Sequence, residues 1–207
     1  MGTDGETRGK LLDSAKKEVL EKGYTKASLR KICADAGVTT GALYFFFKDK
    51  EALFSAIVEK PLLELCQLIQ IHFSEDSEFA ENSDFVHKEG DHDAIVSFLI
   101  HHLYANYEAF HLVLTKSQGS YYENFVDRIV EMTERHYLRI AEKMAAKANG
   151  MKVNHYMTHW LTHMHIDAFI HLLTHEPDEV NAHRQMKKIM DFLVNGFASL
   201  VLIPDEK

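Results

Sequence analysis

Apolar residues recur at helical spacing along most of the chain. In residues 7–22, Leu11 and Ala15 fall on one helical face, while lysines and carboxylates fill the other. Similar apolar stripes follow Lys50 and continue to Ile203, and no segment shows the alternation that is typical of a strand. The pattern predicts an all-α fold without β-strands.

Glycine, proline and capping residues divide this pattern into separate helices. After the first helix, we predict helices over residues 28–36, 40–46, 50–73, 94–106, 107–117, 121–149, 152–175 and 179–203. Pro61 lies inside the fourth helix, where a missing backbone donor favours a kink. Residues 74–93 are acidic and have little apolar periodicity, so we predict a long loop there.

The segment from Ser28 to Lys50 predicts two short helices joined by a tight turn. Gly37 sits at the corner, where glycine adopts a positive φ at low cost, and Thr39 is placed to cap the next helix. A helix over 40–46 would then be the recognition helix of a helix-turn-helix. We therefore predict an N-terminal three-helix DNA-binding domain over residues 1–50 and a larger helical domain over residues 51–207.

The charge distribution fits this division. The 207-residue chain has a net charge of −8, but residues 1–50 hold ten Lys and Arg against seven Asp and Glu, a balance of +3. The remaining residues hold thirteen against twenty-four, a balance of −11. The basic excess coincides with the predicted DNA-binding segment and supports a nucleic-acid partner, although a solvated charged surface has the same composition.

Other features of composition bear on location and redox chemistry. No apolar stretch reaches the roughly 18 residues of a membrane span, so we expect a cytoplasmic protein without membrane contact. Cys33 and Cys66 form no CxxC pattern, which favours two buried thiols over a disulfide or a cysteine-rich zinc site.

The sequence GYTKASLRKICADAGVTTGALYFFFKDKEALF resembles the N-terminal DNA-binding segment of TetR-family transcriptional regulators. The resemblance covers about residues 10–58 and includes the aromatic run, the lysine and the Lys-Glu-x-Leu start of the connecting helix. It implies a regulator, not an enzyme, most simply a repressor that a small-molecule effector releases from double-stranded operator DNA. The rest of the chain resembles the family only in length and helical pattern, and the resemblance implies that residues 51–207 form a helical ligand-binding and dimerisation domain.

The resemblance also implies DNA-contacting residues. Hydroxyls, exposed backbone and a point charge suit contacts to phosphates and base edges. The positions carried over are Ser28, Thr39, Thr40, Gly41, Tyr44 and Lys48. The family often has two tyrosines and a histidine in this helix, whereas here Phe45 and Phe46 follow Tyr44, so fewer side-chain hydrogen bonds to phosphate are expected.

The resemblance further implies a homodimer through residues 152–175 and 179–203. Both segments are too apolar for a monomer surface, unless one face lines the core of the ligand domain. As residues that line an effector site we propose Phe98, His102, Phe110, Tyr121, Met132 and Trp160, although for each residue alone ordinary core packing is the simpler explanation.

The chain contains fourteen histidines, and three of them recur every fourth residue at His155, His159 and His163. Histidines at this spacing can chelate a transition metal, which leaves open a metal- or haem-responsive regulator, or an all-α metal-binding protein or enzyme that does not bind DNA. Buried, hydrogen-bonded histidines or interface histidines are the simpler alternative. We therefore expect no resident cofactor and assign no catalytic residue.

Overall fold

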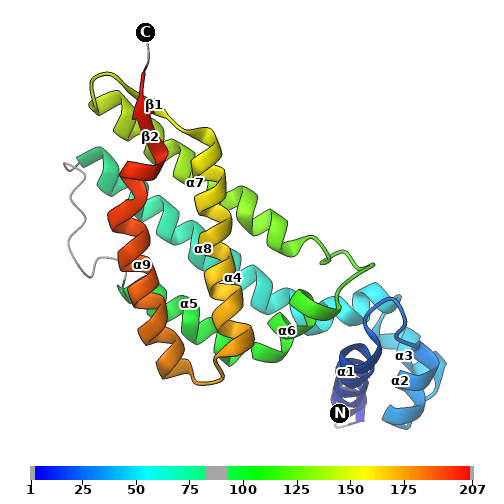
Figure 1. Ribbon diagram of the computed structural model, residues 1–207. Coiled ribbons are helices and arrows are strands. Elements are labelled where there is room, and N and C mark those ends of the chain that lie inside the picture. The colour runs from blue at the N-terminus through cyan, green and yellow to red at the C-terminus, as the bar shows by residue number, and fades with distance from the viewer. Residues whose placement is uncertain (1–2, 83–92, 206–207) are drawn as a thin grey trace. The chain divides into compact units, whose positions relative to one another are not determined.

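The computed structural model describes residues 3–82 and 93–205, in which the larger elements are all helices (Figure 1). The helices are α1 (Thr3–Lys22), α2 (Leu29–Ala36), α3 (Thr40–Phe46), α4 (Lys50–Asn82), α5 (Asp93–Ala105), α6 (Tyr107–Lys116), α7 (Phe125–Lys147), α8 (His155–His175) and α9 (Glu179–Val201). The predicted helical fold class is confirmed. Within these residues no helix combines the length and apolar character that a membrane span requires.

The chain forms two compact units. The first unit contains Met1–Glu64 and Asn106–Val126, and the second contains Leu65–Ala105 and Asp127–Lys207. Helix α4 therefore begins in the first unit and ends in the second, whereas α6 belongs to the first. The boundaries of these units differ from those of the domains predicted over residues 1–50 and 51–207.

In the first unit, apolar side chains from α1, α2, α3 and the start of α4 form one buried core. Its members are Leu11, Ala15, Ile32, Cys33, Ala36, Leu43, Phe47 and Leu53. Full burial of a leucine side chain contributes about 1.5–3 kcal/mol, so this cluster is the main force that holds the short helices together. The helix-turn-helix is thus part of a packed unit.

In the second unit, α8 lies beside α9, and α5 packs against both helices (Figure 1). One buried cluster joins α5, α8 and α9 and comprises Val96, Ile100, Leu172, Ala182 and Met186. Another joins α7, α8 and α9 and comprises Ala141, Leu161, Leu193 and Val201. The apolar stripes that predicted these helices therefore mark their packed faces.

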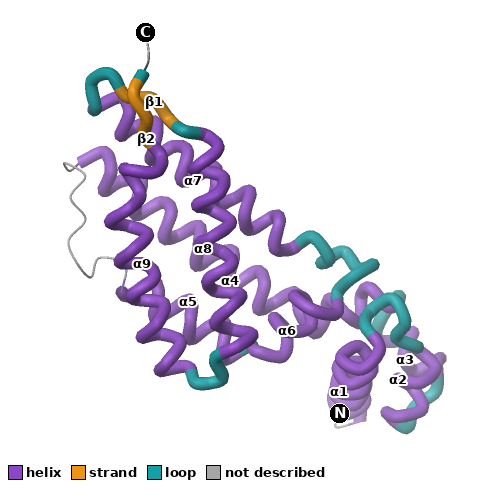
Figure 2. Tube along the Cα trace, viewed as in Figure 1, coloured by secondary structure: helices purple, strands orange, loops and turns teal. Residues whose placement is uncertain are grey.

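Two short strands, β1 (Met151–Val153) and β2 (Leu202–Pro204), pair antiparallel with Lys152 opposite Ile203 (Figure 2). The backbone N–H of Asn154 extends the pairing by donating to the oxygen of Val201 at 2.7 Å. The prediction that the chain has no strand is therefore wrong. Three residues are too few for alternation to be visible in the sequence, and the pairing depends on a partner about fifty residues away.

Several helix boundaries also differ from the prediction, most of all the end of α4. Helix α4 continues through Pro61 to Asn82, so residues 74–82 are helical and the predicted loop is wrong for that part. The rest of that predicted loop, residues 83–92, lies outside the described residues. Helix α7 begins at Phe125, later than predicted, because the preceding residues form turns.

Candidate DNA-binding surface

Helix α3 has one buried and one exposed face. Leu43 is fully buried in the core, whereas Tyr44 and Phe45 are 57% and 76% exposed. Thr40 and Gly41, in the first turn of the helix, are exposed as well. The exposed face therefore presents a hydroxyl group, open backbone and two aromatic rings, all of which can contact phosphates or base edges.

Thr39 caps α3 as predicted, and Ser28 caps α2. The Oγ1 of Thr39 accepts a hydrogen bond from the N–H of Ala42 at 3.2 Å and so begins α3. The Oγ of Ser28 accepts from the N–H of Lys31 at 3.4 Å and begins α2. Both residues are exposed, as is the predicted DNA contact Lys48. The proposed contacts of these residues with DNA stay predictions.

Glu18 supplies a contact that sequence reasoning missed. Its Oε1 accepts a hydrogen bond from the N–H of Ser28 at 3.1 Å, and the residue is only 6% exposed. A capping box would use a Glu or Gln at position 31 for this purpose, but that position holds a lysine. A carboxylate from α1 therefore completes the N-terminus of α2 and ties the two helices together.

Gly41 is not required by the packing of the protein itself. A Cβ added at this position would meet only the Oγ1 of Thr39 at 3.7 Å, which is an ordinary contact. Its φ is not positive, since the positive-φ glycines lie elsewhere in the described chain. Glycine inside a helix costs about 0.5–1 kcal/mol relative to alanine. A close approach of another molecule to this backbone would explain why the smallest residue is found here.

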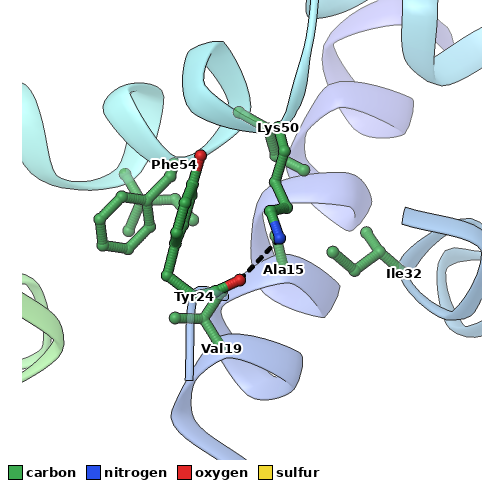
Figure 3. Close-up of a pocket in the computed structure, with 8 residues that line it drawn as sticks. Ala15, Val19, Tyr24, Ile32, Lys50 and Phe54 are labelled. Atoms are coloured by element: carbon green, nitrogen blue, oxygen red, sulfur yellow. Dashed lines mark hydrogen bonds between the residues drawn. The ribbon is translucent and has the colours of Figure 1, made fainter. Parts of the chain in front are cut away.

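Lys50, at the start of α4, anchors the connection between α1 and α2 (Figure 3). Its Nζ donates to the backbone oxygens of Tyr24, Thr25 and Ala27 at 2.7, 3.1 and 3.3 Å. The Nζ also lies 4.6 Å from the centroid of the Tyr24 ring. Burial lowers the pKa of the Lys50 ammonium. The void beside these residues is about 10 Å³, which leaves room for one water at most.

Glu51 links the same connection to the residues that follow α6. Its Oε2 accepts from the hydroxyl of Tyr24 at 2.6 Å, and its Oε1 accepts from the N–H of Tyr121 at 3.2 Å. Burial, followed by the bond to the Glu51 carboxylate, raises the pKa of the Tyr24 hydroxyl. The Lys-Glu pair that begins α4 is therefore structural, whereas sequence reasoning used it only as part of a family motif.

The turn after α6 contacts the connection between α1 and α2 directly. The N–H of Tyr24 donates to the oxygen of Lys116 at 2.8 Å, and the Oγ1 of Thr25 donates to the oxygen of Gln118 at 2.6 Å. Gly119 in this turn has a φ of +85°, and an added Cβ would lie 2.6 Å from the Oγ1 of Thr25. These contacts join residues about ninety positions apart, which is why no local pattern predicted them.

Comparison with known families agrees with this geometry. The family described as "Bacterial regulatory proteins, tetR family" matches residues 11–57, which span the end of α1 through the start of α4. Over these residues the chain is similar to TetR-family regulators. This match contains the predicted DNA-contacting residues from Ser28 to Lys48.

Three curated relatives are similar to part of this chain. The HTH-type transcriptional repressor BepR of Brucella suis is 43% identical over 53 residues, 26% of this chain and 25% of the relative. The regulator AcrR of Shigella flexneri is 48% identical over 54 residues, which are 26% of this chain and 25% of AcrR. UidR of Escherichia coli K12 is 36% identical over 72 residues, and the match covers 32% of this chain and 37% of UidR. The chain thus matches about a quarter to a third of the length of these relatives.

Solved structures extend the similarity in fold to most of the chain. A transcriptional regulator from Aquifex aeolicus has a TM-score of 0.58 at 19% identity and covers 90% of this chain and 99% of its own. NalD of Pseudomonas aeruginosa is the secondary repressor of the MexAB-OprM multidrug efflux pump. Its structure has a TM-score of 0.57 at 19% identity, and the match covers 93% of this chain and 97% of NalD. At this identity the two neighbours support a common fold.

The six residues predicted to line an effector site are divided between the two units. Phe110, which is buried, and Tyr121, which is 70% exposed, belong to the first unit. The second unit contains the other four, Phe98, His102, Met132 and Trp160. Phe98 is 62% exposed and Trp160 is 44% exposed. The effector site therefore stays a prediction.

The histidines predicted as metal ligands lie in the first turns of α8. His155 is exposed, while the Nδ1 of His159 lies 3.0 Å from the Oε2 of Glu134 on α7. The rings of His159 and His163 are 4.6 Å apart, measured between centroids. Across residues 3–82 and 93–205, no group of three or more His, Cys, Asp or Glu side chains is placed to hold a metal ion.

Proposed function

We propose that this protein is a transcriptional repressor that binds double-stranded operator DNA through α3 and is released by a small-molecule ligand. The observation that carries the proposal is the exposed face of α3, with Thr40, Gly41 and Tyr44, on a helix whose other face is packed in the core. Thr39 and Lys48, at the two ends of the helix, add a hydroxyl and a positive charge. The backbone N–H groups at the start of the helix favour phosphate.

The assignment as a repressor draws on the relatives. BepR is named a transcriptional repressor, and NalD is described as a repressor of an efflux pump. A repressor of this kind acts when its recognition helices occupy the operator and block transcription. A ligand releases it if the ligand binds more tightly to a conformation that fits the operator poorly.

The proposal includes a homodimer, because a pair of helix-turn-helix units reads two half-sites about 34–36 Å apart or at a multiple of that distance. Helices α8 and α9 are the proposed interface. They expose large apolar side chains in the single chain, namely Tyr156, Trp160, Val180 and Phe192 at 73%, 44%, 65% and 69% exposure. Burial of such residues in a second copy would remove this apolar surface from water.

The contacts around Tyr24 suggest how a ligand in the second unit would affect DNA binding. Residues 106–126 belong to the first unit, although both the preceding α5 and the following α7 lie mainly in the second. The chain therefore passes between the units at residues 64–65, 105–106 and 126–127. Glu51, Tyr24 and Thr25 connect α4 and the turn after α6 to the helix-turn-helix. A shift of these segments would move α1 and α2 as well.

A gel-shift titration of the full-length protein with DNA from upstream of its own gene tests the proposal. We expect a complex with this DNA in the presence of excess unrelated duplex, and about a tenfold or greater loss of affinity in a Thr40→Ala/Tyr44→Phe variant. Light scattering should give the mass of a dimer. Absence of any specific complex, or unchanged affinity in the variant, would contradict the assignment of α3.

A further inference from the structure

Helix α8 carries two pairs of histidines in which the residues are four positions apart. The rings of His159 and His163 have centroids 4.6 Å apart, and those of His171 and His175 have centroids 4.3 Å apart. Residues four apart on a helix lie on the same face, one turn above the other. The rings of the first pair meet edge to face, with 68° between their planes, whereas those of the second pair are stacked, with 18° between their planes.

A carboxylate orients one ring of the first pair. The Nδ1 of His159 lies 3.0 Å from the Oε2 of Glu134, which is on α7. When His159 is neutral and its Nδ1–H donates to this carboxylate, the lone pair is on Nε2. Histidines that bind metals are commonly held in this way, because the acceptor fixes the tautomer and makes the ring more basic. Glu134 is 25% exposed, so its charge is only partly screened by solvent.

We propose that His159 and His163 bind one divalent transition-metal ion of the imidazole-preferring class, such as Zn²⁺, with Glu134 as the residue that positions His159. Imidazole nitrogen suits Zn²⁺, Cu²⁺ and Ni²⁺, whereas Mg²⁺ prefers oxygen. No group of three or more His, Cys, Asp or Glu side chains is placed to hold an ion in the described residues, so the proposed site has two protein ligands and water would complete the coordination. Binding of the ion does not depend on the DNA-binding function proposed above.

The second pair provides a matched comparison on the same helix. The Nδ1 of His175 lies 2.8 Å from the Oγ1 of Thr174 and 3.0 Å from the backbone oxygen of His171, so its partners are neutral and neither is a carboxylate. His171 and His175 are both exposed. His155, which is one turn before His159 and is also exposed, provides a single-residue comparison. If spacing alone determined metal binding, both pairs would bind equally.

Isothermal titration of the metal-free, full-length protein with Zn²⁺ at pH 7.5 tests the proposal, with Mg²⁺ as the control ion. We expect one Zn²⁺ per chain and no binding of Mg²⁺. The variant His159→Gln/His163→Gln should lose the site, whereas His171→Gln/His175→Gln and His155→Gln should keep it. Glu134→Gln should weaken binding about 10- to 100-fold, as substitutions of orienting residues do.

Two controls keep the result interpretable. Circular dichroism of each variant checks the helical fold, and His163→Gln alone removes one ligand if the double variant does not fold, because it leaves the bond between His159 and Glu134 in place. Equal loss of Zn²⁺ in both double variants, or no binding by the unmodified protein, would overturn the proposal. Since the titration contains no DNA, its outcome is separate from that of the gel shift.

Discussion

The Nζ of Lys50 donates a hydrogen bond to the backbone oxygen of Tyr24 at 2.7 Å (Figure 3). The same ammonium reaches the oxygens of Thr25 and Ala27, so a single side chain satisfies three carbonyls of one connection. This bond fixes the end of α1 relative to the start of α4, and therefore helps to set the position of the helix-turn-helix within the first unit.

Replacement of Lys50 by methionine should lower the free energy of unfolding by about 1.5–3 kcal/mol, the usual range for a hydrogen bond to a charged group. Methionine keeps most of the apolar stem but removes the hydrogen bonds of the ammonium to the three carbonyls, of which that of Tyr24 keeps a second donor, the N–H of Ala27 at 3.2 Å. Urea unfolding of the full-length protein measures the change. Lys48→Met is the matched control, because Lys48 is exposed and its loss should change stability by no more than about 0.5 kcal/mol. Equal effects of the two substitutions would contradict the anchoring role.

The raised pKa of Tyr24 predicts a loss of stability at alkaline pH. An unfolded tyrosine ionises near pH 10, whereas burial and the Glu51 carboxylate keep the folded Tyr24 protonated to higher pH. The stabilisation is therefore complete below about pH 10 and declines above it, with a slope of at most about 1.4 kcal/mol per pH unit.

Comparison with Tyr24→Phe isolates this effect, since phenylalanine keeps the aromatic ring. The centroid of this ring lies 5.1 Å from that of Phe54. Unfolding of both proteins should be measured in urea from pH 8 to pH 11. We expect the difference in the free energy of unfolding between the unmodified protein and the variant to shrink above about pH 10. A difference that stays constant across the range would mean that Tyr24 ionises equally in both states.

Local signals predicted the helix-turn-helix well, because the necessary information lies within a few residues. Ser28 and Thr39 have side chains that cap, and Gly37 adopts its φ of +69° without a Cβ to oppose it. The contacts that Lys50 and Glu51 make were not predictable from their neighbours in sequence, because their partners at Tyr24 and Tyr121 come from other elements. The strand pair at Lys152 and Ile203 was missed for the same reason.

The turn after α6 allows a test of its contact with Thr25. Gly119→Ala introduces a Cβ at a φ of +85° and only 2.6 Å from the Oγ1 of Thr25. Gly150→Ala is the matched control, because Gly150 has a similar φ of +74° but nothing within 4 Å of the added atom. The backbone strain, about 1–3 kcal/mol, is common to both variants, so we expect Gly119→Ala to destabilise the protein more.

A second substitution tests whether the greater destabilisation by Gly119→Ala comes from the contact with Thr25. Thr25→Ala removes the hydroxyl that the new Cβ would meet, although it also removes the bond to Gln118. In a double-mutant cycle, Thr25→Ala/Gly119→Ala should therefore lose less stability than the sum of the two single variants. Additive losses, or equal losses for Gly119→Ala and Gly150→Ala, would show that the turn does not press on Thr25.

Substitution of Gly41 tests contact between α3 and DNA separately from the stability of the protein. The space around Gly41 admits a Cβ, so Gly41→Ala should leave the free energy of unfolding unchanged or raise it by about 0.5–1 kcal/mol. If DNA approaches this backbone, the same methyl group should lower affinity for the upstream fragment by about tenfold or more.

Gly9→Ala in α1 is the control, since an added Cβ there meets nothing within 4 Å. A stable Gly41→Ala protein with reduced affinity, beside a Gly9→Ala protein with normal affinity, would place the contact on α3. Unchanged affinity in Gly41→Ala would require another explanation for glycine at this position, because the internal packing of the protein does not supply one.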